Sequence, residues 1–218
     1  MPEIILMCDP AVAAIPIQEC DERLVDVRGS DLLVGHSRQD AAGAYAHVRA
    51  NIFERLLMAQ AALPKGLRLL LVEGYRPPEL QERYFAEYAA ELQAANPSWS
   101  IDQVHMAASR YVSPPSIAPH AAGAAVDVTL IDTDGRELDL GTRVNASPEE
   151  SDGACYMDAD NISGGAREHR RVLASALAEA GFVNYPTEWW HWSRGDRYWA
   201  LSTASATAPY GPCSLPLP

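Results

Sequence analysis

The chain has 218 residues and nearly half of them are hydrophobic, which is enough for one domain with a full core. Its formal net charge of −12 argues against a nucleic-acid partner and against an anionic membrane, because both attract basic surfaces. No run of about 18 apolar residues occurs, so no membrane-spanning helix is expected. We predict a single domain over residues 1–218, in which residues 1–14 and 201–218 are peripheral extensions.

The four cysteines are scattered along the chain: Cys8, Cys20, Cys155 and Cys213. They form no CxxC pair, so neither a disulfide framework nor a cysteine-type zinc site is indicated. The first residues are mildly apolar but lack the basic start of a secretory signal. These features predict free thiols and a cytoplasmic location.

The pattern of the chain changes at Tyr45. Residues 1–44 show no period and contain many turn formers, so we expect them to be irregular. After them, apolar residues recur at every fourth position: Val48, Ile52, Leu56 and Ala59. This spacing predicts an amphipathic helix that ends near residues 64–66. Residues 67–72 form an apolar run between turn signals, which predicts a buried strand.

A helix is expected over residues 79–95, because Pro78 suits a first helical turn, where no N–H donor is needed. A short helix near residues 100–110 follows. Residues 111–125 are rich in proline, glycine and small side chains, which predicts a loop. The apolar residues 126–131 then predict a second strand.

Residues 140–164 are polar and rich in glycine without a period, which predicts a long functional or covering loop. Apolar residues on one face predict a helix over 166–180, and Gly181 is placed to cap it in the left-handed conformation. Two short strands are expected over 182–185 and 188–193. The few, short strands among several helices indicate an α+β fold, with a small, mainly antiparallel sheet covered by helices.

Two segments, residues 118–127 and 188–191, contain residues suited to a metal. His120 and Asp127 are separated by alanine and glycine at the mouth of a predicted strand, so the backbone can bend to bring both side chains to one ion. His191 would join them from the later strand. Two imidazoles and one carboxylate, with the fourth position left to water, suit a hydrolytic zinc site. We therefore predict one Zn²⁺ per chain at the sheet, bound by these three residues.

The other histidines are interpreted as surface or core residues, which is the commoner role of an isolated histidine. They are His36, His47, His105 and His169.

Glu188 lies three residues before His191, and on a flat strand two such side chains point to opposite faces. A bulge, twist or tight turn at Trp189-Trp190 is therefore required for both to reach the metal. A carboxylate so close to a cation would act as the general base, taking a proton from the metal-activated water and later giving one to the leaving amine. The tryptophans, including Trp192, are interpreted as core residues rather than as a substrate box.

Arg76 follows the strand predicted for residues 67–72, and the next residue, Pro77, makes the backbone rigid. Its guanidinium could stabilise the oxyanion of a tetrahedral intermediate or bind a substrate carboxylate. The alternative is a surface arginine at the start of a helix.

With these residues the sequence resembles the zinc D-alanyl-D-alanine dipeptidases, which are related to zinc D,D-carboxypeptidases. The family pattern is Ser-x-His-x-x-Gly-x-Ala-x-Asp followed later by Glu-Trp-Trp-His, and it corresponds to residues 118–127 and 188–191. The Gly-Tyr-Arg-Pro segment is intact at 74–77, and the similarity extends over roughly residues 15–200 with the same order and spacing. The resemblance implies the ligands and base named above, and Arg76 as the residue that stabilises the intermediate.

The resemblance also implies a very small substrate with a free amine and a free carboxylate, most simply D-Ala-D-Ala. Two positions depart from the family: Ala118 replaces a serine that positions the substrate amine, and Asn145 stands where an aspartate is usual. Ser116 is the nearest serine to the first position. For the missing carboxylate, candidates are Glu73, Asp152, Asp158 and Asp160.

Three functions remain open from the sequence. The first is zinc-dependent hydrolysis of a small dipeptide, most simply D-Ala-D-Ala. The second is a D,D-carboxypeptidase that trims cell-wall precursor peptides, and the missing export signal argues against it. The third is a non-catalytic zinc-binding module, which would not need the base Glu188.

Overall fold

A five-stranded sheet forms the centre of the computed structural model, which describes residues 4–215. Its strands, in spatial order, are β2 (Leu33–Val34), β4 (Arg68–Glu73), β5 (Ala125–Ile131), β7 (His191–Ser193) and β6 (Val183–Asn184). Only the β2–β4 pair is parallel; β4–β5, β5–β7 and β6–β7 are antiparallel. The expected small, mainly antiparallel sheet is therefore confirmed.

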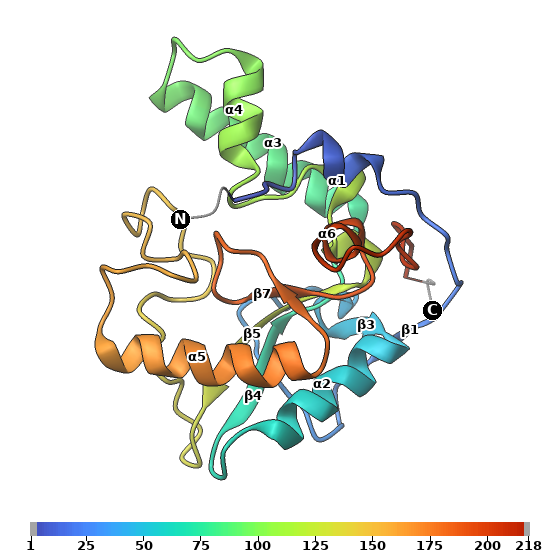
Figure 1. The fold of residues 1–218 in the computed structure, drawn as a ribbon, viewed down its shortest axis with the longest axis vertical. Coiled ribbons are helices and arrows are strands. Elements are labelled where there is room, and N and C mark those ends of the chain that lie inside the picture. Colours follow the sequence, from blue (N-terminus) through green and yellow to red (C-terminus); the bar gives the residue numbers. More distant parts are fainter. Residues whose placement is uncertain (1–3, 216–218) are drawn as a thin grey trace.

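Two helices, α2 (Ala50–Ala62) and α5 (Gly164–Glu179), lie side by side against this sheet (Figure 1). Ile52 and Leu56 of α2 and Leu173 of α5 are fully buried in one cluster with the apolar residues of β4 and β5. Gly181 follows α5 with a φ of 85°, the left-handed conformation expected of its cap. The main core therefore lies between these two helices and the sheet.

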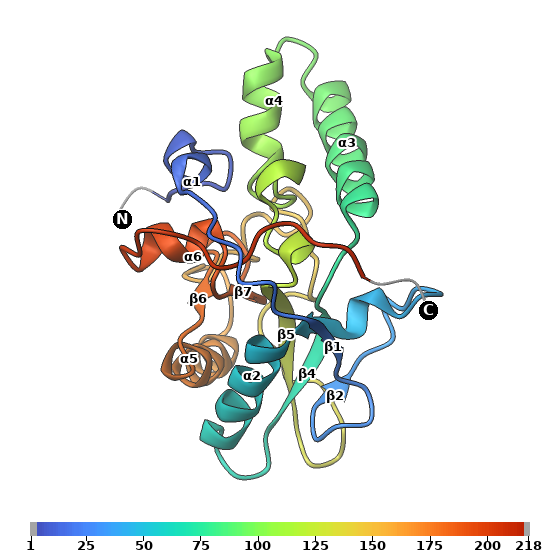
Figure 2. The same ribbon diagram turned by 90° about the vertical axis from the view of Figure 1, so that its right-hand side faces the viewer.

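A helical hairpin of α3 (Pro78–Ala95) and α4 (Ile101–Ala108) projects from the sheet (Figure 2). Its apolar residues form a separate cluster. Ser100 begins α4 with a capping box, in which its side chain accepts from Gln103 N–H and its own N–H donates to the Gln103 side chain. Both helices agree with the sequence, and side chains of α3 line the same cavity as Asp127 of β5.

The terminal segments run along the outside of this unit and are attached by packing. Two short helices, α1 (Pro10–Ala14) and α6 (Arg197–Ser202), contact each other, and Met7 and Val12 are fully buried. Nearer the C-terminus, the N–H of Cys213 donates to the carbonyl of Ala121 at 3.0 Å. This bond joins the tail to the short 3₁₀ helix η3 (His120–Ala122).

The strands expected over 67–72 and 126–131 are confirmed, but the start of the first helix is wrong. Residues 45–49 form part of a 3₁₀ helix, η1 (Ala44–Ala46), and the strand β3 (His47–Arg49). The strand β1 (Leu24–Asp26), in a region expected to be irregular, pairs antiparallel with β3. The long-range pairing therefore overrides the local helical period.

The cysteines and the helices of the described residues bear on two further expectations. Every cysteine carries a free thiol. Within residues 4–215, no helix is both long enough and apolar enough to cross a membrane.

Candidate metal centre and substrate cavity

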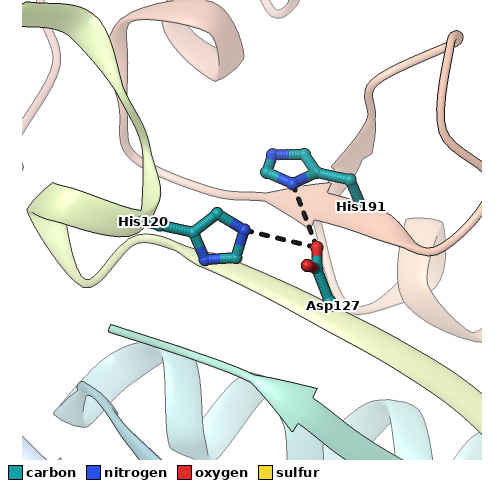
Figure 3. A group of neighbouring side chains, drawn as sticks. All are labelled: His120, Asp127 and His191. Carbon is teal, nitrogen blue, oxygen red and sulfur yellow. Dashed lines mark hydrogen bonds and ion pairs between the residues drawn. The ribbon is translucent and has the colours of Figure 1, made fainter. Parts of the chain in front are cut away.

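Three side chains from three elements meet at one end of the central sheet (Figure 3). Asp127 in β5 and His191 at the start of β7 are direct partners across these antiparallel strands, so both side chains point to the same face. His120 begins η3, and Gly123, with a φ of 65°, turns the chain from η3 into β5. The strand pairing and this turn place the three predicted ligands side by side.

We call His120, Asp127 and His191 the metal cluster. Asp127 Oδ1 lies 3.3 Å from His120 Nε2 and 3.1 Å from His191 Nδ1 (Figure 3). The three ligand atoms lie within 4.8 Å of one another, and each residue is at most 4% exposed. Two imidazole nitrogens and a carboxylate oxygen at these positions fit a metal ion that keeps one place open. Residues 4–215 contain no second group of this kind, so none of the other histidines joins one.

The protonation states at the metal cluster suit a cation. His120 Nδ1 lies 2.6 Å from the carbonyl oxygen of Gly74; an N–H donated there leaves the lone pair of Nε2 free for a metal. Burial lowers the pKa of His191, which favours the neutral imidazole. Burial opposes ionisation of Asp127, but the two imidazoles hold the pKa of its carboxyl well below the usual range. Metals bind these forms of both side chains.

Glu188 reaches the metal cluster because the chain turns sharply before β7. The N–H of His191 donates to the carbonyl of Glu188 at 3.3 Å, and this turn contains Trp189-Trp190. It brings Glu188 Oε2 to 3.8 Å from His191 Nδ1. Burial, followed by the negative charge of Asp127, raises the pKa of Glu188 well above its ordinary value. The turn required by the three-residue spacing is thus present, and Trp189, Trp190 and Trp192 are core residues as expected.

Arg76 is buried beside the cluster and is not a surface residue. Its Nε and Nη2 each donate to a different carboxylate oxygen of Glu73 at 2.7 Å, and its Nη1 donates to Gln81 Oε1 at 2.8 Å. Burial disfavours the charge of Arg76, but Glu73 keeps the pKa of the guanidinium above its ordinary value. Both oxygens of Glu73 therefore accept from Arg76, and Glu73 is absent from the lining of the cavity described below.

A cavity of about 250 Å³ opens onto the metal cluster, Glu188 and Arg76. The departure noted at Asn145 lies in its lining, but the sequence did not identify several of the residues that complete it: Arg38, Tyr84, Tyr88, Tyr111 and Ser113. The first of these lies in a segment without a period, where no local pattern marked it. The tyrosines Tyr84 and Tyr88 are four apart on α3, a spacing that could have indicated a common face.

Two of the predicted substrate-binding residues lie elsewhere. Ser116 is exposed in the 3₁₀ helix η2 (Pro115–Ile117), and it is Ser113 that lines the cavity, because the prolines after it turn the chain away. Asp152 is exposed at a turn with a φ of 50° and is also absent from the cavity lining. The long loop that contains it contributes Asn145 to the cavity instead.

Comparison with known proteins agrees with this geometry. The family model described as D-Ala-D-Ala dipeptidase, of the M15 peptidases, matches residues 36–207. The chain belongs to this family. It is therefore a peptidase, and every residue of the metal cluster, together with Glu188 and Arg76, lies inside the matched range.

Several relatives are named D-alanyl-D-alanine dipeptidase, and two of them cover most of this chain or nearly two thirds of it. That of Synechocystis sp. is 28% identical over 216 residues, which cover 86% of this chain and 87% of the relative. That of Enterococcus faecium is 36% identical over 145 residues, which cover 64% and 68%. Among solved structures, VanYB in complex with D-alanine-D-alanine aligns with a TM-score of 0.49 at 18% identity, over 90% of this chain and 94% of that one.

Proposed function

We propose that the protein is a zinc-dependent dipeptidase that hydrolyses D-Ala-D-Ala, with one zinc ion per chain held by His120, Asp127 and His191. The observation that carries the proposal is a buried set of two imidazoles and one carboxylate that shares a cavity with a second carboxylate, Glu188. The names of the relatives support the choice of dipeptide. The proposal includes the cytoplasmic location expected from the sequence.

The donor set fits zinc because it offers two nitrogens and one oxygen, and because the second nitrogen of His120 is already bonded to a backbone carbonyl. When bound, zinc supplies a positive charge that polarises the peptide carbonyl and makes water a stronger acid. Side chains of this protein carry out the proton transfer and stabilise the negative oxygen that forms.

Glu188 is the residue that moves the proton. Its carboxylate accepts a proton from the water that attacks the peptide carbonyl carbon, and delivers it to the nitrogen that leaves when the C–N bond breaks. The products are two free D-alanines. Burial raises the pKa of Glu188, which favours the second of these transfers, in which the carboxyl acts as an acid.

Arg76 stabilises the negative oxygen that forms during the attack. Three of its N–H groups bond Glu73 and Gln81, so the guanidinium is fixed in place before the substrate binds. A guanidinium has five N–H groups, which leaves two for the substrate. A donor held in place in this way stabilises the transition state more than a mobile one does, because it need not reorganise during the reaction.

The test is hydrolysis of D-Ala-D-Ala compared with a pentapeptide that ends in D-Ala-D-Ala, after chelation and after zinc is restored. We expect zinc-dependent cleavage of the dipeptide and little cleavage of the pentapeptide. The cavity of about 250 Å³ is smaller than the usual pocket for a drug-sized ligand, and a pentapeptide needs more room than a dipeptide. Preferred cleavage of the pentapeptide would instead identify a D,D-carboxypeptidase. Cleavage of neither peptide by protein that holds one zinc would contradict both assignments.

A further inference from the structure

A second arginine, Arg38, lines the same cavity as Arg76. It lies in the irregular segment between β2 and η1. Its guanidinium carbon is 5.4 Å from the ring centre of Tyr84, and that of Arg76 is 5.1 Å from the same centre. We call Arg38, Arg76 and Tyr84 the arginine wall. Tyr84 is thus a common support for two cationic groups that both line the cavity.

The arginine wall carries more positive than negative charge. Its nearby carboxylate is Glu73, and both oxygens of that carboxylate accept from Arg76 at 2.7 Å. Arg38 Nε lies 3.6 Å from Glu73 Oε2, too far for a good hydrogen bond. Two guanidinium groups therefore share one buried carboxylate, and one positive charge is left without a partner of its own.

The other neighbours of Arg38 are neutral. With the amide of Asn145 oriented so that its oxygen faces the guanidinium, Oδ1 accepts from Arg38 Nε and Nη2 at 3.1 Å each. Arg38 Nη1 donates weakly to the Tyr84 hydroxyl at 3.5 Å. These bonds engage three of the five N–H groups of the guanidinium. Two remain, on a side chain that is 27% exposed, whereas that of Glu73 is only 4% exposed.

Among the described residues, the acidic side chains that line the cavity form no ion pair with Arg38, although its positive charge acts to lower the pKa of Glu188 against the larger effect of burial. Asp127 and Glu188 belong to the metal cluster and its base, and Glu87 and Glu91 lie on the exposed side of α3. A substrate ammonium would be repelled at Arg38, whereas a substrate carboxylate would complete an alternating series of charges with Glu73 and the two arginines. A guanidinium with two free N–H groups is well suited to bind a carboxylate.

We propose that Arg38 binds a carboxylate of the substrate and makes that carboxylate a requirement for tight binding. The proposal rests on the proposed dipeptidase function and adds a residue that determines specificity. The carboxylate comes either from the C-terminus of the dipeptide or from an acidic side chain, and the chemistry of recognition is the same for both.

The experiment compares Arg38→Met with Arg83→Met in the zinc-loaded enzyme. Arg83 is a matched control, because its guanidinium carbon is 5.8 Å from the same Tyr84 ring centre but its side chain is 63% exposed and does not line the cavity. The substrates are D-Ala-D-Ala, its C-terminal amide and D-Asp-D-Ala. Zinc content and thermal unfolding establish that each variant is folded.

We expect Arg38→Met to raise the KM for D-Ala-D-Ala by about ten- to a hundredfold with a small change in kcat, which is the usual size of a lost hydrogen bond to a charged group. The amide should be a poor substrate of the natural enzyme, and Arg38→Met should not raise the KM for the amide further. A loss confined to D-Asp-D-Ala would assign the carboxylate to a side chain. Equal losses for acid and amide, or an unchanged KM for both acids, would overturn the proposal.

A binding measurement separates this proposal from the proposed function. Glu188→Gln protein loaded with zinc is titrated with D-Ala-D-Ala in a calorimeter, with and without Arg38→Met. A Kd that rises about tenfold or more with Arg38→Met supports the role of Arg38, even if the natural enzyme cleaves none of the three peptides. An equal Kd in the two proteins would overturn it.

Discussion

The metal cluster and the arginine wall line the same cavity but are built differently. The metal cluster comes from β5, β7 and η3, is at most 4% exposed, and owes its geometry to strand pairing and one glycine turn. Arg38 lies in an irregular segment, and its neighbour Asn145 comes from a long loop. In the proposed mechanism the sheet therefore holds the reaction geometry, while Arg38 and Asn145, proposed to lie beside the rest of the substrate, are on segments that vary more easily.

One of the two departures from the family pattern, at Asn145, agrees with this division. The three proposed ligands, the proposed base Glu188 and the Gly-Tyr-Arg-Pro segment are all retained. Asn145, which replaces the usual aspartate, belongs to the cavity lining and contacts Arg38. Changes at the metal cluster should therefore abolish the chemistry, whereas changes at Arg38 and Asn145 should alter the choice of substrate.

The largest effect is expected from the metal cluster itself. Asp127→Asn or His191→Ala removes one of three ligands, so we expect loss of zinc and of all measurable D-Ala-D-Ala hydrolysis. Metal content after dialysis checks the first result, and a kinetic assay checks the second. His105→Ala is the control, because His105 is exposed on α4 and does not line the cavity. Zinc retained by Asp127→Asn at full occupancy would remove Asp127 from the ligand set.

Glu188→Gln should separate binding from chemistry. The variant keeps the shape of the side chain and all three ligands, so it should bind zinc like the natural protein. Its kcat should fall by about 10²–10⁴-fold, the usual contribution of a general acid–base group. Parallel measurement of zinc content and kcat distinguishes this result from metal loss. Near-normal turnover would show that another group transfers the proton.

Arg76→Lys should have a smaller effect on the same reaction. A lysine keeps the positive charge but cannot form the paired bonds to Glu73 or present the same N–H groups to the substrate. We expect kcat to fall by about 10²-fold, typical for the loss of one oxyanion donor. Arg83→Lys, at an exposed position, should leave kcat unchanged. A similar loss in both variants would show that the effect is not specific to Arg76.

The smallest expected effect is on stability. Burial raises the pKa of Glu188, so the folded metal-free protein binds this proton more tightly than the unfolded chain does. The resulting stabilisation is fully present below the unfolded pKa of about 4.3 and is lost as the pH rises through the folded value. Glu188→Gln should therefore raise the Tm of the metal-free protein at pH 7, by roughly 2–4 °C for each kcal/mol gained.

Thermal unfolding of the metal-free protein at pH 4 and pH 7 checks this result. The advantage of the variant should shrink toward pH 4. A lower Tm at pH 7 for the variant would indicate that ionised Glu188 is compensated by contacts in the folded protein.

Long periodic segments and spaced ligands were predictable from the sequence. The strands β4 and β5 and the helix α5 follow from continuous apolar runs or a helical stripe, and α3 follows from the proline at its first turn. The metal cluster follows from the spacing of His120 and Asp127 together with the later His191. In these cases the deciding interaction is local, or is fixed by a motif with definite spacing.

The remainder depends on contacts between distant segments. The strand β3 replaces the expected start of a helix because it pairs with β1, more than twenty residues earlier. Arg38 and Asn145 meet across more than a hundred residues, in segments without a period. Ser116 is the serine nearest to the family position in sequence, but the prolines around it direct the chain away from the cavity. No local pattern contains this information.

The central claim is tested most directly by a stoichiometric titration. Metal-free protein receives increasing zinc while D-Ala-D-Ala hydrolysis is followed, with Glu188→Gln beside it. Activity of the natural protein should rise linearly and stop at one zinc per chain, and the variant should bind the same amount with little activity. Hydrolysis by the metal-free protein, or zinc bound at one per chain without hydrolysis in the natural protein, would contradict the account.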